Sequence, residues 1–280
     1  MSLNRRALVH TGARFVFGLA AVPPAWPQGI PISDMVALLV TDYPLSFVPI
    51  TIDGEPVRAM LDSGSSTALR LSARLAARLN LALTPRPNAF VQGLDGRRIP
   101  LQQGRIRRFS VGAITQDAVA VEVAGERIEG IAAQVGTAFD AVLGWGFLSR
   151  QYFVLDYPAR RLLLAASPSD TAVMQGTPVP VVTTQGLPIL QGRIDDAPVQ
   201  LLLDTGAPMC NIDQASAGAS IGSIVSRQLT VGGLQLPMQW RVKDLAAQRR
   251  AVDTAGTLGN NFLMRYSVAF DPVRGTIRFT

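Results

Sequence analysis

The chain has 280 residues, of which 48% are apolar, so it can bury a sizeable core as one domain or as two. Its net charge of +6 comes from scattered arginines without a basic run or stripe, which argues against a nucleic-acid-binding protein. The only histidine, His10, lies in the extreme N-terminus, and the only cysteine, Cys210, cannot form an intrachain disulfide. If the N-terminus is removed, no histidine remains for a serine or cysteine hydrolase or a His-ligated zinc site. Carboxylates are then the natural acid–base groups.

The first 27 residues are typical of an export signal. They contain three arginines, no acidic residue and an apolar stretch over 15–22. The pair Arg5-Arg6 also resembles a twin-arginine signal, and an amphipathic anchor or a disordered tail is the alternative interpretation. No other stretch approaches the roughly 20 apolar residues of a membrane span. We expect a signal peptide at 1–27 and an exported protein, periplasmic or in the cell envelope, with no integral membrane span in its mature form.

The next stretch predicts a β-hairpin that leads into a polar turn. Residues 36–41 read as a strand, and the apolar runs 47–52 and 57–61 flank an Asp-Gly pair, which is a strong hairpin signal. The second arm runs directly into Asp-Ser-Gly-Ser-Ser at 62–66. A single Asp-Ser-Gly triplet is a weak signal, because any turn uses small polar residues and glycine.

After the turn, leucines at helical spacing with Ser72 as N-cap predict a helix over 72–80 that packs on the sheet. Apolar arms around a glycine-containing turn predict a second hairpin over 88–104. Its tip consists of Gly93, Leu94, Asp95 and Gly96. Further strands follow over 105–123, and the half closes near residue 165. The small, polar and proline-containing stretch 166–178 is typical of a linker.

The second half repeats the first, and this repeat decides the predicted fold. At an offset of 142 residues, the triplet that begins at Asp62 meets Asp-Thr-Gly at 204–206. At an offset of 115, Val-Leu-Gly at 142–144 meets Thr-Leu-Gly at 257–259. The offset falls from 142 to 115, that is by 27 residues, so the second half lacks material after its triplet. The missing part corresponds to the helix and the hairpin over 88–104.

We therefore expect an N-terminal lobe over 34–165, a linker over 166–178 and a C-terminal lobe over 179–280 without the second hairpin. The 25 glycines and 19 prolines, with few helical patterns, indicate a mostly β protein.

Two aspartates brought together by such a repeat have a defined chemistry. Like-charge repulsion raises the pKa of one carboxyl, so the pair holds one proton over a wide pH range. The charged member, Asp62 or Asp204, can take a proton from a water between them, and the protonated member can hydrogen-bond a carbonyl under attack. Gly64 and Gly206 allow tight turns. The hydroxyls of Ser63 and Thr205 are placed to bond the opposite loop.

With these motifs, the sequence resembles aspartic proteases. It is nearest in style to bacterial retropepsin-like proteins, with two lobes in one chain as in pepsin-like enzymes. The resemblance covers about 45–165 and 180–280. It implies a bilobal fold of two related β-barrel-like lobes with few short helices, catalytic Asp62 and Asp204, and no cofactor or metal. It also implies an extended polypeptide substrate, and a monomer in which the two lobes form a pseudo-dimer.

The resemblance further implies one flap hairpin over 88–104, with its tip at 93–96. The flap lacks the tyrosine common in pepsin-like enzymes, and Phe90 is the nearest aromatic residue. Around the catalytic turns, Ser65 follows Gly64, whereas Ala207 follows Gly206. A hydroxyl at this position can stabilise the adjacent carboxylate. We therefore expect Asp62 to ionise more readily and Asp204 to carry the proton.

Two functions remain open from the sequence: an aspartic endopeptidase, or a non-catalytic two-lobed module of the cell envelope that binds peptides. Asp156 and Asp271, which correspond in the repeat, are interpreted as structural caps before turns. Trp145 either lines the cleft or fills the core. Cys210 is interpreted as a small buried apolar residue.

Overall fold

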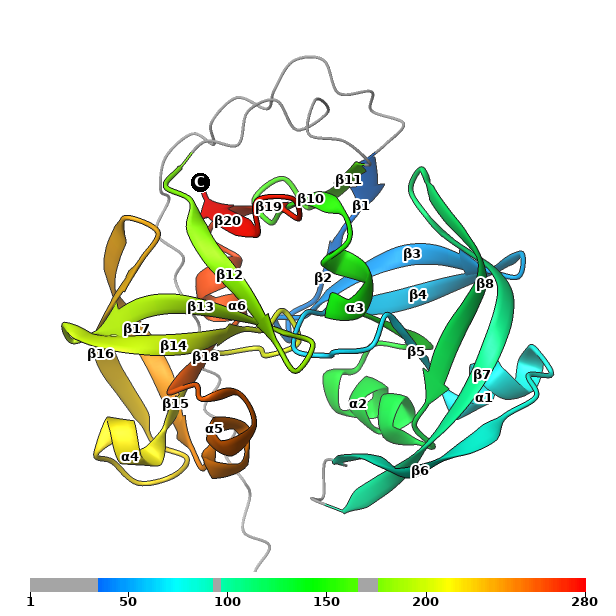
Figure 1. Ribbon diagram of the computed structural model, residues 1–280, viewed down its shortest axis with the longest axis horizontal. Coiled ribbons are helices and arrows are strands. Elements are labelled where there is room, and N and C mark those ends of the chain that lie inside the picture. Colours follow the sequence, from blue (N-terminus) through cyan, green and yellow to red (C-terminus); the bar gives the residue numbers. More distant parts are fainter. Residues whose placement is uncertain (1–34, 93–96, 166–175) are drawn as a thin grey trace, which may run out of the picture.

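The structure, a computed structural model, describes residues 35–92, 97–165 and 176–280. The predicted signal peptide at 1–27, the flap tip at 93–96 and most of the linker lie outside the described residues. Within them, short helices surround a large amount of β-structure, which is arranged as two barrels and a shared layer (Figure 1).

Six strands of the first half close into a barrel. Its hairpin turns at Asp53 and Gly54, whose positive φ angles of 50° and 89° fit a tight two-residue turn and confirm the predicted hairpin. The ring closes because the first strand of the hairpin also pairs with a later strand, through Ile52 and Phe109. In ring order the strands are β3 (Ser46–Ile52), β4 (Glu55–Asp62), β9 (Ala141–Gly144), β5 (Leu69–Leu71), β8 (Ile114–Val123) and β7 (Arg98–Val111).

Six strands of the second half close into a barrel of the same order. In ring order they are β13 (Leu187–Ile194), β14 (Ala197–Leu203), β18 (Gly256–Leu258), β15 (Asn211–Asp213), β17 (Leu234–Lys243) and β16 (Ile224–Val231). Here β13 pairs with β16, through Ile194 and Leu229, to close the ring. The two-barrel architecture predicted from the repeat is therefore confirmed.

The two barrels differ mainly in one strand. In the first, β6 (Thr84–Gln92) pairs with the beginning of β7 and forms the two arms of the predicted hairpin. In the described part of the second barrel, no strand pairs at the corresponding edge of β16. The material missing from the second half therefore corresponds mostly to β6 and to the part of β7 with which it pairs.

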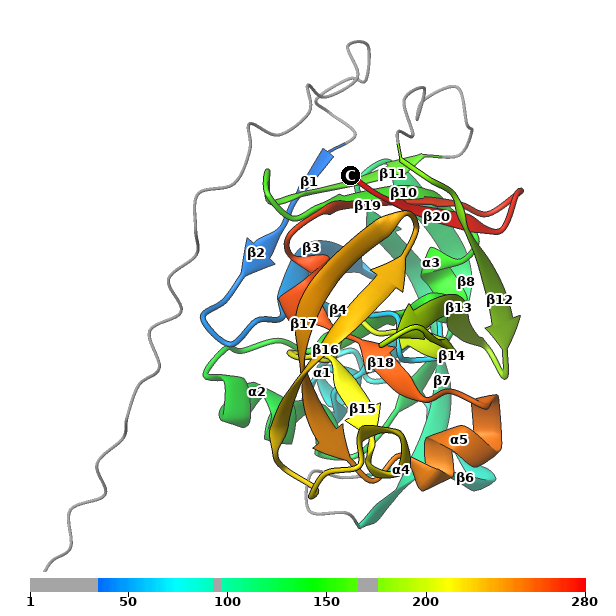
Figure 2. The same ribbon diagram turned by 90° about the vertical axis from the view of Figure 1, so that its left-hand side faces the viewer.

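A layer of six strands joins the two halves, and the sequence did not predict it. β10 (Tyr152–Asp156) of the first half pairs antiparallel with β19 (Ser267–Asp271) of the second, with Val154 opposite Ala269. Each half adds two strands on its own side, so the layer lies across one end of both barrels (Figures 1 and 2). These strands are β11 (Arg161–Ala165) and β1 (Met35–Ala37), then β20 (Thr276–Phe279) and β12 (Val179–Thr184). The short β2 (Leu39–Val40) pairs instead with β3.

Six short helices lie around the barrels in the described residues. The predicted helix is α1 (Ala73–Arg78), where the hydroxyl of the N-cap Ser72 accepts a hydrogen bond from the amide of Leu75 at 3.0 Å. Two helices that the sequence analysis missed lie opposite each other, one on each barrel (Figure 1). They are α2 (Arg127–Val135) and α5 (Ala246–Val252). The remaining helices are α3 (Trp145–Leu148), α4 (Gln214–Ala217) and α6 (Asn260–Leu263).

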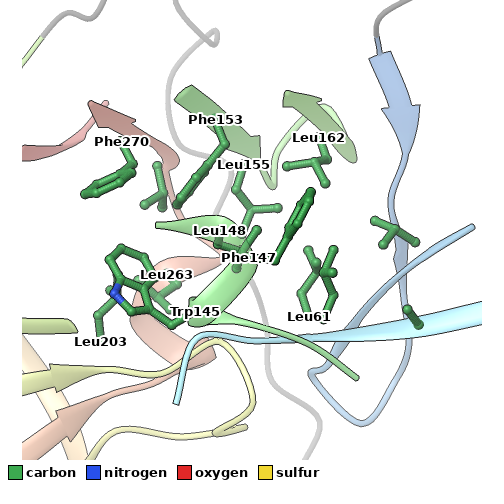
Figure 3. Packing of buried hydrophobic residues seen from close by; sticks show 14 of the residues in the cluster. Leu61, Trp145, Phe147, Leu148, Phe153, Leu155, Leu162, Leu203, Leu263 and Phe270 are labelled. Carbon is green, nitrogen blue, oxygen red and sulfur yellow. The ribbon is translucent and has the colours of Figure 1, made fainter. Parts of the chain in front are cut away.

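The layer between the lobes rests on a continuous aromatic and aliphatic core (Figure 3). Trp145 is 1% exposed, and its ring lies 4.9 Å from that of Phe270, which stacks on Phe153 at 5.4 Å. Trp145 therefore fills the core and does not line a cleft. Because these contacts join residues of both halves, burial of apolar surface favours holding the two barrels in one arrangement.

Three smaller predictions concern single side chains. Cys210 is fully buried, as expected, and burial raises the pKa of its thiol to about 12. Asp156 accepts a hydrogen bond from the amide of Ala159, and Asp271 accepts one from the amide of Arg274, so both cap turns as predicted.

None of the helices in the described ranges has the length and apolar character needed to span a membrane.

Candidate active site

Each of the two aspartates lies at the end of a barrel strand, beside the glycine of the downstream apolar segment. Asp62 ends β4, which runs parallel to β9 and places Asp62 opposite Gly144. Asp204 follows β14, which runs parallel to β18, and its amide donates to the carbonyl of Leu258 at 3.0 Å. The repeat in the sequence therefore becomes a twofold arrangement of two loops.

The two carboxylates oppose each other, each against the glycine of the other loop. A Cβ atom added to Gly64 would lie 2.6 Å from Cγ of Asp204. A Cβ atom added to Gly206 would lie 2.5 Å from Oδ1 of Asp62. Both distances are far shorter than normal contacts. Only glycine leaves room for the opposite carboxylate, so the structure brings the four residues together as the motifs suggested.

The hydroxyls of Ser63 and Thr205 exchange hydrogen bonds between the loops. The amide of Ser63 donates to Oγ1 of Thr205 at 2.9 Å, and the amide of Thr205 donates to Oγ of Ser63 at 3.0 Å. Oγ of Ser63 also donates to the carbonyl of Leu203 at 2.7 Å. All of these groups are buried, so each bond satisfies a donor that water does not reach. The exchange fixes the spacing of the two loops.

We expect Thr205→Val to weaken this exchange. The amide of Ser63 would lose its acceptor in a buried position, which costs about 2 kcal/mol of unfolding free energy. Thr205→Ser keeps the hydroxyl and should lose much less unfolding free energy. Chemical denaturation of the two variants therefore measures the contribution of this hydrogen bond to stability. Equal stability of the valine and serine variants would show that the hydrogen bonds between the two loops do not stabilise the fold.

Ser65 and Ala207 support the loops through their backbones. The amide of Ser65 donates to the carbonyl of Asp62 at 3.0 Å, and the amide of Ala207 donates to that of Asp204 at 3.2 Å. Oγ of Ser65 is buried and forms no hydrogen bond with any described residue. The expected stabilisation of the Asp62 carboxylate by this hydroxyl is therefore not seen. The reason is geometric, since only the backbone of Ser65 takes part in the turn.

The glycines of the downstream segments pack directly against the loops that carry Asp62 and Asp204. A Cβ atom on Gly259 would lie 2.5 Å from the carbonyl oxygen of Met209 and 2.8 Å from that of Ala207. A Cβ atom on Gly144 would collide with the carbonyls of Thr67 and Ser65. The glycine that ends each Leu-Gly pair is therefore required by close approach of two backbones.

Asn260 is a buried residue of the site that the sequence analysis missed. Its Nδ2 donates to the carbonyl of Thr205 at 2.8 Å and to that of Pro44 at 2.6 Å. Its Oδ1 accepts from the hydroxyl of Tyr157 at 3.2 Å. Asn260 thus connects the loop that carries Asp204 to two segments of the first half. In the repeat it corresponds to Trp145, whose Nε1 likewise crosses to the other half and donates to Thr183 at 3.2 Å.

The environment of the two aspartates favours holding a proton between them. Burial and, after it, the negative charge of Asp62 together raise the pKa of Asp204 to about 8, against an opposing hydrogen bond from the amide of Gly206. Burial also raises the pKa of Asp62, but the positive charge of Arg70 opposes that rise. The pKa of both carboxyls is raised, but the charge of Asp62 adds to the rise at Asp204, whereas the charge of Arg70 opposes it at Asp62. These charges favour Asp204 as the carrier of the proton and Asp62 as the ionised partner.

The raised pKa of Asp204 has a consequence for stability. A carboxyl whose pKa is higher in the folded state than its ordinary 3.8 binds more protons when folded, so its contribution to stability is lost as the pH rises towards about 8. We expect the melting temperature of the wild type to fall between these pH values relative to that of Asp204→Asn. Parallel calorimetric curves for the two proteins would contradict the raised pKa.

The predicted flap is described only in its arms. Phe90 pairs with Pro100 and Val91 with Ile99, so the hairpin is present, while Gly93, Leu94, Asp95 and Gly96 lie outside the described residues. Phe90 is 47% exposed, and the guanidinium of Arg98 lies 4.3 Å from the centre of its ring. The role of this hairpin as a flap stays a prediction.

A polar hollow of about 730 Å³ lies on the second barrel, and neither aspartate lines it. Its walls come from β13, β14, α4 and α5 and include Arg193 and Arg249. Arg249 is already paired with Asp213 at 2.8 Å. The hollow is therefore a feature separate from the site at the aspartates.

Together, two related closed barrels and two opposed Asp-Ser/Thr-Gly turns define a bilobal protein with the aspartic-protease fold. Comparison with known families agrees: residues 48–147, from β3 to α3, match the family model described as aspartyl protease. The matched segment contains Asp62 and the Leu-Gly pair that packs on its loop. A search of the curated proteins finds no match. The similarity to retropepsin-like aspartic proteases expected from the sequence is therefore confirmed.

Proposed function

We propose that the protein is an aspartic endopeptidase that hydrolyses peptide bonds with a water activated between Asp62 and Asp204. The observation that carries this proposal is the opposition of the two carboxylates, each held against the glycine of the other loop. A binding module would not need two like charges at such close range, because the pair costs free energy unless it is protonated. The match of the first lobe to aspartyl proteases supports a protease in general.

In the proposed reaction, ionised Asp62 takes a proton from the water, and the resulting hydroxide attacks the carbonyl carbon of the substrate. Protonated Asp204 donates a hydrogen bond to the carbonyl oxygen and so stabilises the negative charge that develops there. Asp204 transfers its proton to that oxygen, which gives a neutral tetrahedral diol. When the carbon–nitrogen bond breaks, the proton held by Asp62 passes to the leaving nitrogen. One diol hydroxyl returns its proton to Asp204, which restores the starting pair.

The surroundings of the pair support these roles. The Ser63–Thr205 exchange holds the loops at a fixed spacing, so little reorganisation is needed during the reaction. The substrate would be an extended polypeptide under the hairpin formed by β6 and β7. We further propose that the protein is exported and acts as a monomer, with both aspartates from one chain.

The test is a cleavage assay on casein and on a peptide library between about pH 3 and pH 7, since a shared proton is needed. Wild-type protein should cleave, a pepstatin-type inhibitor should block it, and Asp62→Asn should be inactive. Asp62→Asn preserves shape, and circular dichroism checks its fold. If the folded wild type binds library peptides but cleaves none at any pH, the alternative function as a peptide-binding module is correct.

A further inference from the structure

Three arginines and one glutamate form a positively charged cluster on the first barrel. This arginine cluster consists of Arg70 on β5, Arg86 on β6, Arg127 on α2, and Glu122 on β8. Nη2 of Arg70 lies 2.8 Å from Oε2 of Glu122, and Arg86 pairs with the other oxygen of the same carboxylate. One carboxylate thus serves two guanidinium groups. The four side chains of the cluster carry three positive charges and one negative charge.

The strand register places Arg70 on the same face of the barrel as Asp62. Arg70 lies opposite Val142, and Val142 lies opposite Met60 on the next strand. Directly paired residues project to one face of a sheet, and Asp62 follows Met60 by two residues on that face. Leu69 and Leu71, the neighbours of Arg70, point into the barrel and are buried. Arg70 therefore lies on the same face of the sheet as the catalytic Asp62, on the second strand from it.

Helix α2 brings Arg127 to the same face. Ile128 packs with Met60 and Val142 outside the barrel, so the start of the helix lies over the strands that carry Asp62. Arg127 directly precedes Ile128 and is half-buried. Burial raises the pKa of Asp62, and the charges of Arg70 and Arg127 oppose the rise, so both guanidinium groups lie within electrostatic range of this carboxylate.

Gathering these cations in the wall of the site costs free energy. Burial and, after it, the nearby positive charge of Arg70 lower the pKa of Arg127, as expected for like charges at short range, and the charge of Asp62 opposes this shift. Arg70 is only 12% exposed in its side chain, and its Nε is buried with no hydrogen-bond acceptor in the described residues. An anionic group from outside the chain would offset both the repulsion and the missing acceptor.

We propose that the arginine cluster binds an acidic side chain of the substrate, so that the enzyme prefers peptides with glutamate or aspartate close to the bond that is cut. A substrate whose scissile bond lies at Asp62 must pass along the face that carries Arg70 and Arg127. A carboxylate one or two residues from that bond is the group that reaches them. This inference rests on the proposed function, because it names the substrate class of the same site.

The competing explanation is that the cluster only braces the fold. Glu122 connects β5 to β6 through its two arginines, and this bridge would hold the hairpin arm on the barrel without any ligand. Bracing predicts no dependence of cleavage on substrate charge. The two explanations therefore differ in a ratio of rates, which does not depend on the overall activity of each variant.

The experiment compares pairs of fluorogenic peptides around a cleavage site found in casein. Within each pair, one of the positions flanking the cut is either glutamate or glutamine. We expect kcat/KM to favour glutamate at one position by about tenfold at low salt, which corresponds to about 1.4 kcal/mol. The preference should shrink in about 0.5 M NaCl because salt screens partly exposed charges.

Variants then assign the preference to the cluster. Arg127→Gln should bring the glutamate-to-glutamine ratio close to one, and Arg127→Lys, which keeps the charge, should retain most of it. Arg108→Gln is the control, since Arg108 pairs with the exposed Asp117 on strands away from Asp62. It should leave the ratio unchanged. Thermal unfolding confirms that each variant is folded, and Arg86→Gln, which also removes one positive charge of the cluster and should lower the ratio, serves if Arg127→Gln does not fold.

The outcomes distinguish a failure of the proposed function from a failure of the proposed preference for acidic substrates. If the wild type cleaves no peptide of either kind, the proposed function itself fails. If it cleaves both members of every pair equally, or prefers glutamine, the inference about the cluster is wrong and the protease function stands. A preference for glutamate that survives Arg127→Gln would also overturn it, because another part of the protein would then recognise the acid.

Discussion

Replacing Gly206 by alanine should slow peptide hydrolysis by about a hundredfold and lower the stability of the folded protein. The added Cβ atom would lie 2.5 Å from Oδ1 of Asp62, so either the loop or the carboxylate must move. Overpacking of this kind costs about 1 to 3 kcal/mol in unfolding free energy. A displacement of about 1 Å at the reacting groups costs on the order of a hundredfold in rate. Activity assays and chemical denaturation of the purified variant measure the two effects.

Gly64→Ala should behave in the same way, because its Cβ atom would meet the carboxylate of Asp204 at 2.6 Å. Gly218→Ala is the control. Gly218 has a positive φ of 61° and no atom within 4 Å of an added Cβ. That change should cost about 1 kcal/mol through backbone strain and leave hydrolysis intact. Full activity in Gly206→Ala would mean that the two loops are not as closely opposed as described.

Replacing Asn260 by alanine should have the next largest effect. The change leaves the carbonyls of Thr205 and Pro44 and the hydroxyl of Tyr157 without their partner in a buried region. The loss of several buried hydrogen bonds should cost about 3 kcal/mol. Because one of these carbonyls belongs to the second catalytic loop, we also expect kcat to fall more than KM rises.

Tyr157→Phe separates the contributions within this network. It removes only the hydroxyl that donates to Oδ1 of Asn260, at 3.2 Å, and keeps the ring in the core. We expect a loss of about 1 kcal/mol and a smaller change in kcat. If Tyr157→Phe lowers kcat as much as Asn260→Ala, the tyrosine hydroxyl rather than the contact with the catalytic loop controls the site.

The sequence predicted the parts of the site that are encoded locally. An apolar arm and an Asp-Ser/Thr-Gly triplet follow each other directly in both halves, and their repetition indicated two related barrels. The meeting of Asp62 and Asp204 followed from that repetition, whereas the close approach of Gly64 to Asp204 was not predicted. The hydroxyl exchange between Ser63 and Thr205 could likewise be expected from residue type and symmetry.

Helix α2 was missed although its sequence contains a signal. Ile128, Ile131, Ala132 and Val135 recur at helical spacing, and the first of them packs against Met60 and Val142. The segment is short and contains Gly130, which weakens a helical pattern. Helix α5 has a weaker signal still, since it buries only Val252. Tertiary packing rather than local preference therefore stabilises both helices.

Contacts between distant segments could not be predicted from local patterns. The side chain of Asn260 donates to the carbonyl of Pro44, 216 residues away, and no local sequence pattern near either residue predicts that hydrogen bond. The pairing of β10 with β19 likewise joins two strands that each read only as the end of their own half. For Ser65 the sequence predicted an interaction that the structure lacks. Its residue type suggested a hydrogen bond from the hydroxyl to the neighbouring carboxylate, and the geometry of the turn does not provide it.

The strand layer shared by the two halves is built as a symmetric pair of chains would build it. Each half contributes three strands in mirrored order, as two copies of one shorter chain would in a symmetric pair. Two identical copies carry identical loops, so the two aspartates of such a pair have the same surroundings and the same intrinsic pKa. A single chain with two halves has no such restriction. The first half has β6 where the described part of the second half has no corresponding strand, and alanine stands at 207 where serine stands at 65. A symmetric pair shares its proton equally between its two aspartates, whereas the two different halves of this chain allow one aspartate to hold it preferentially.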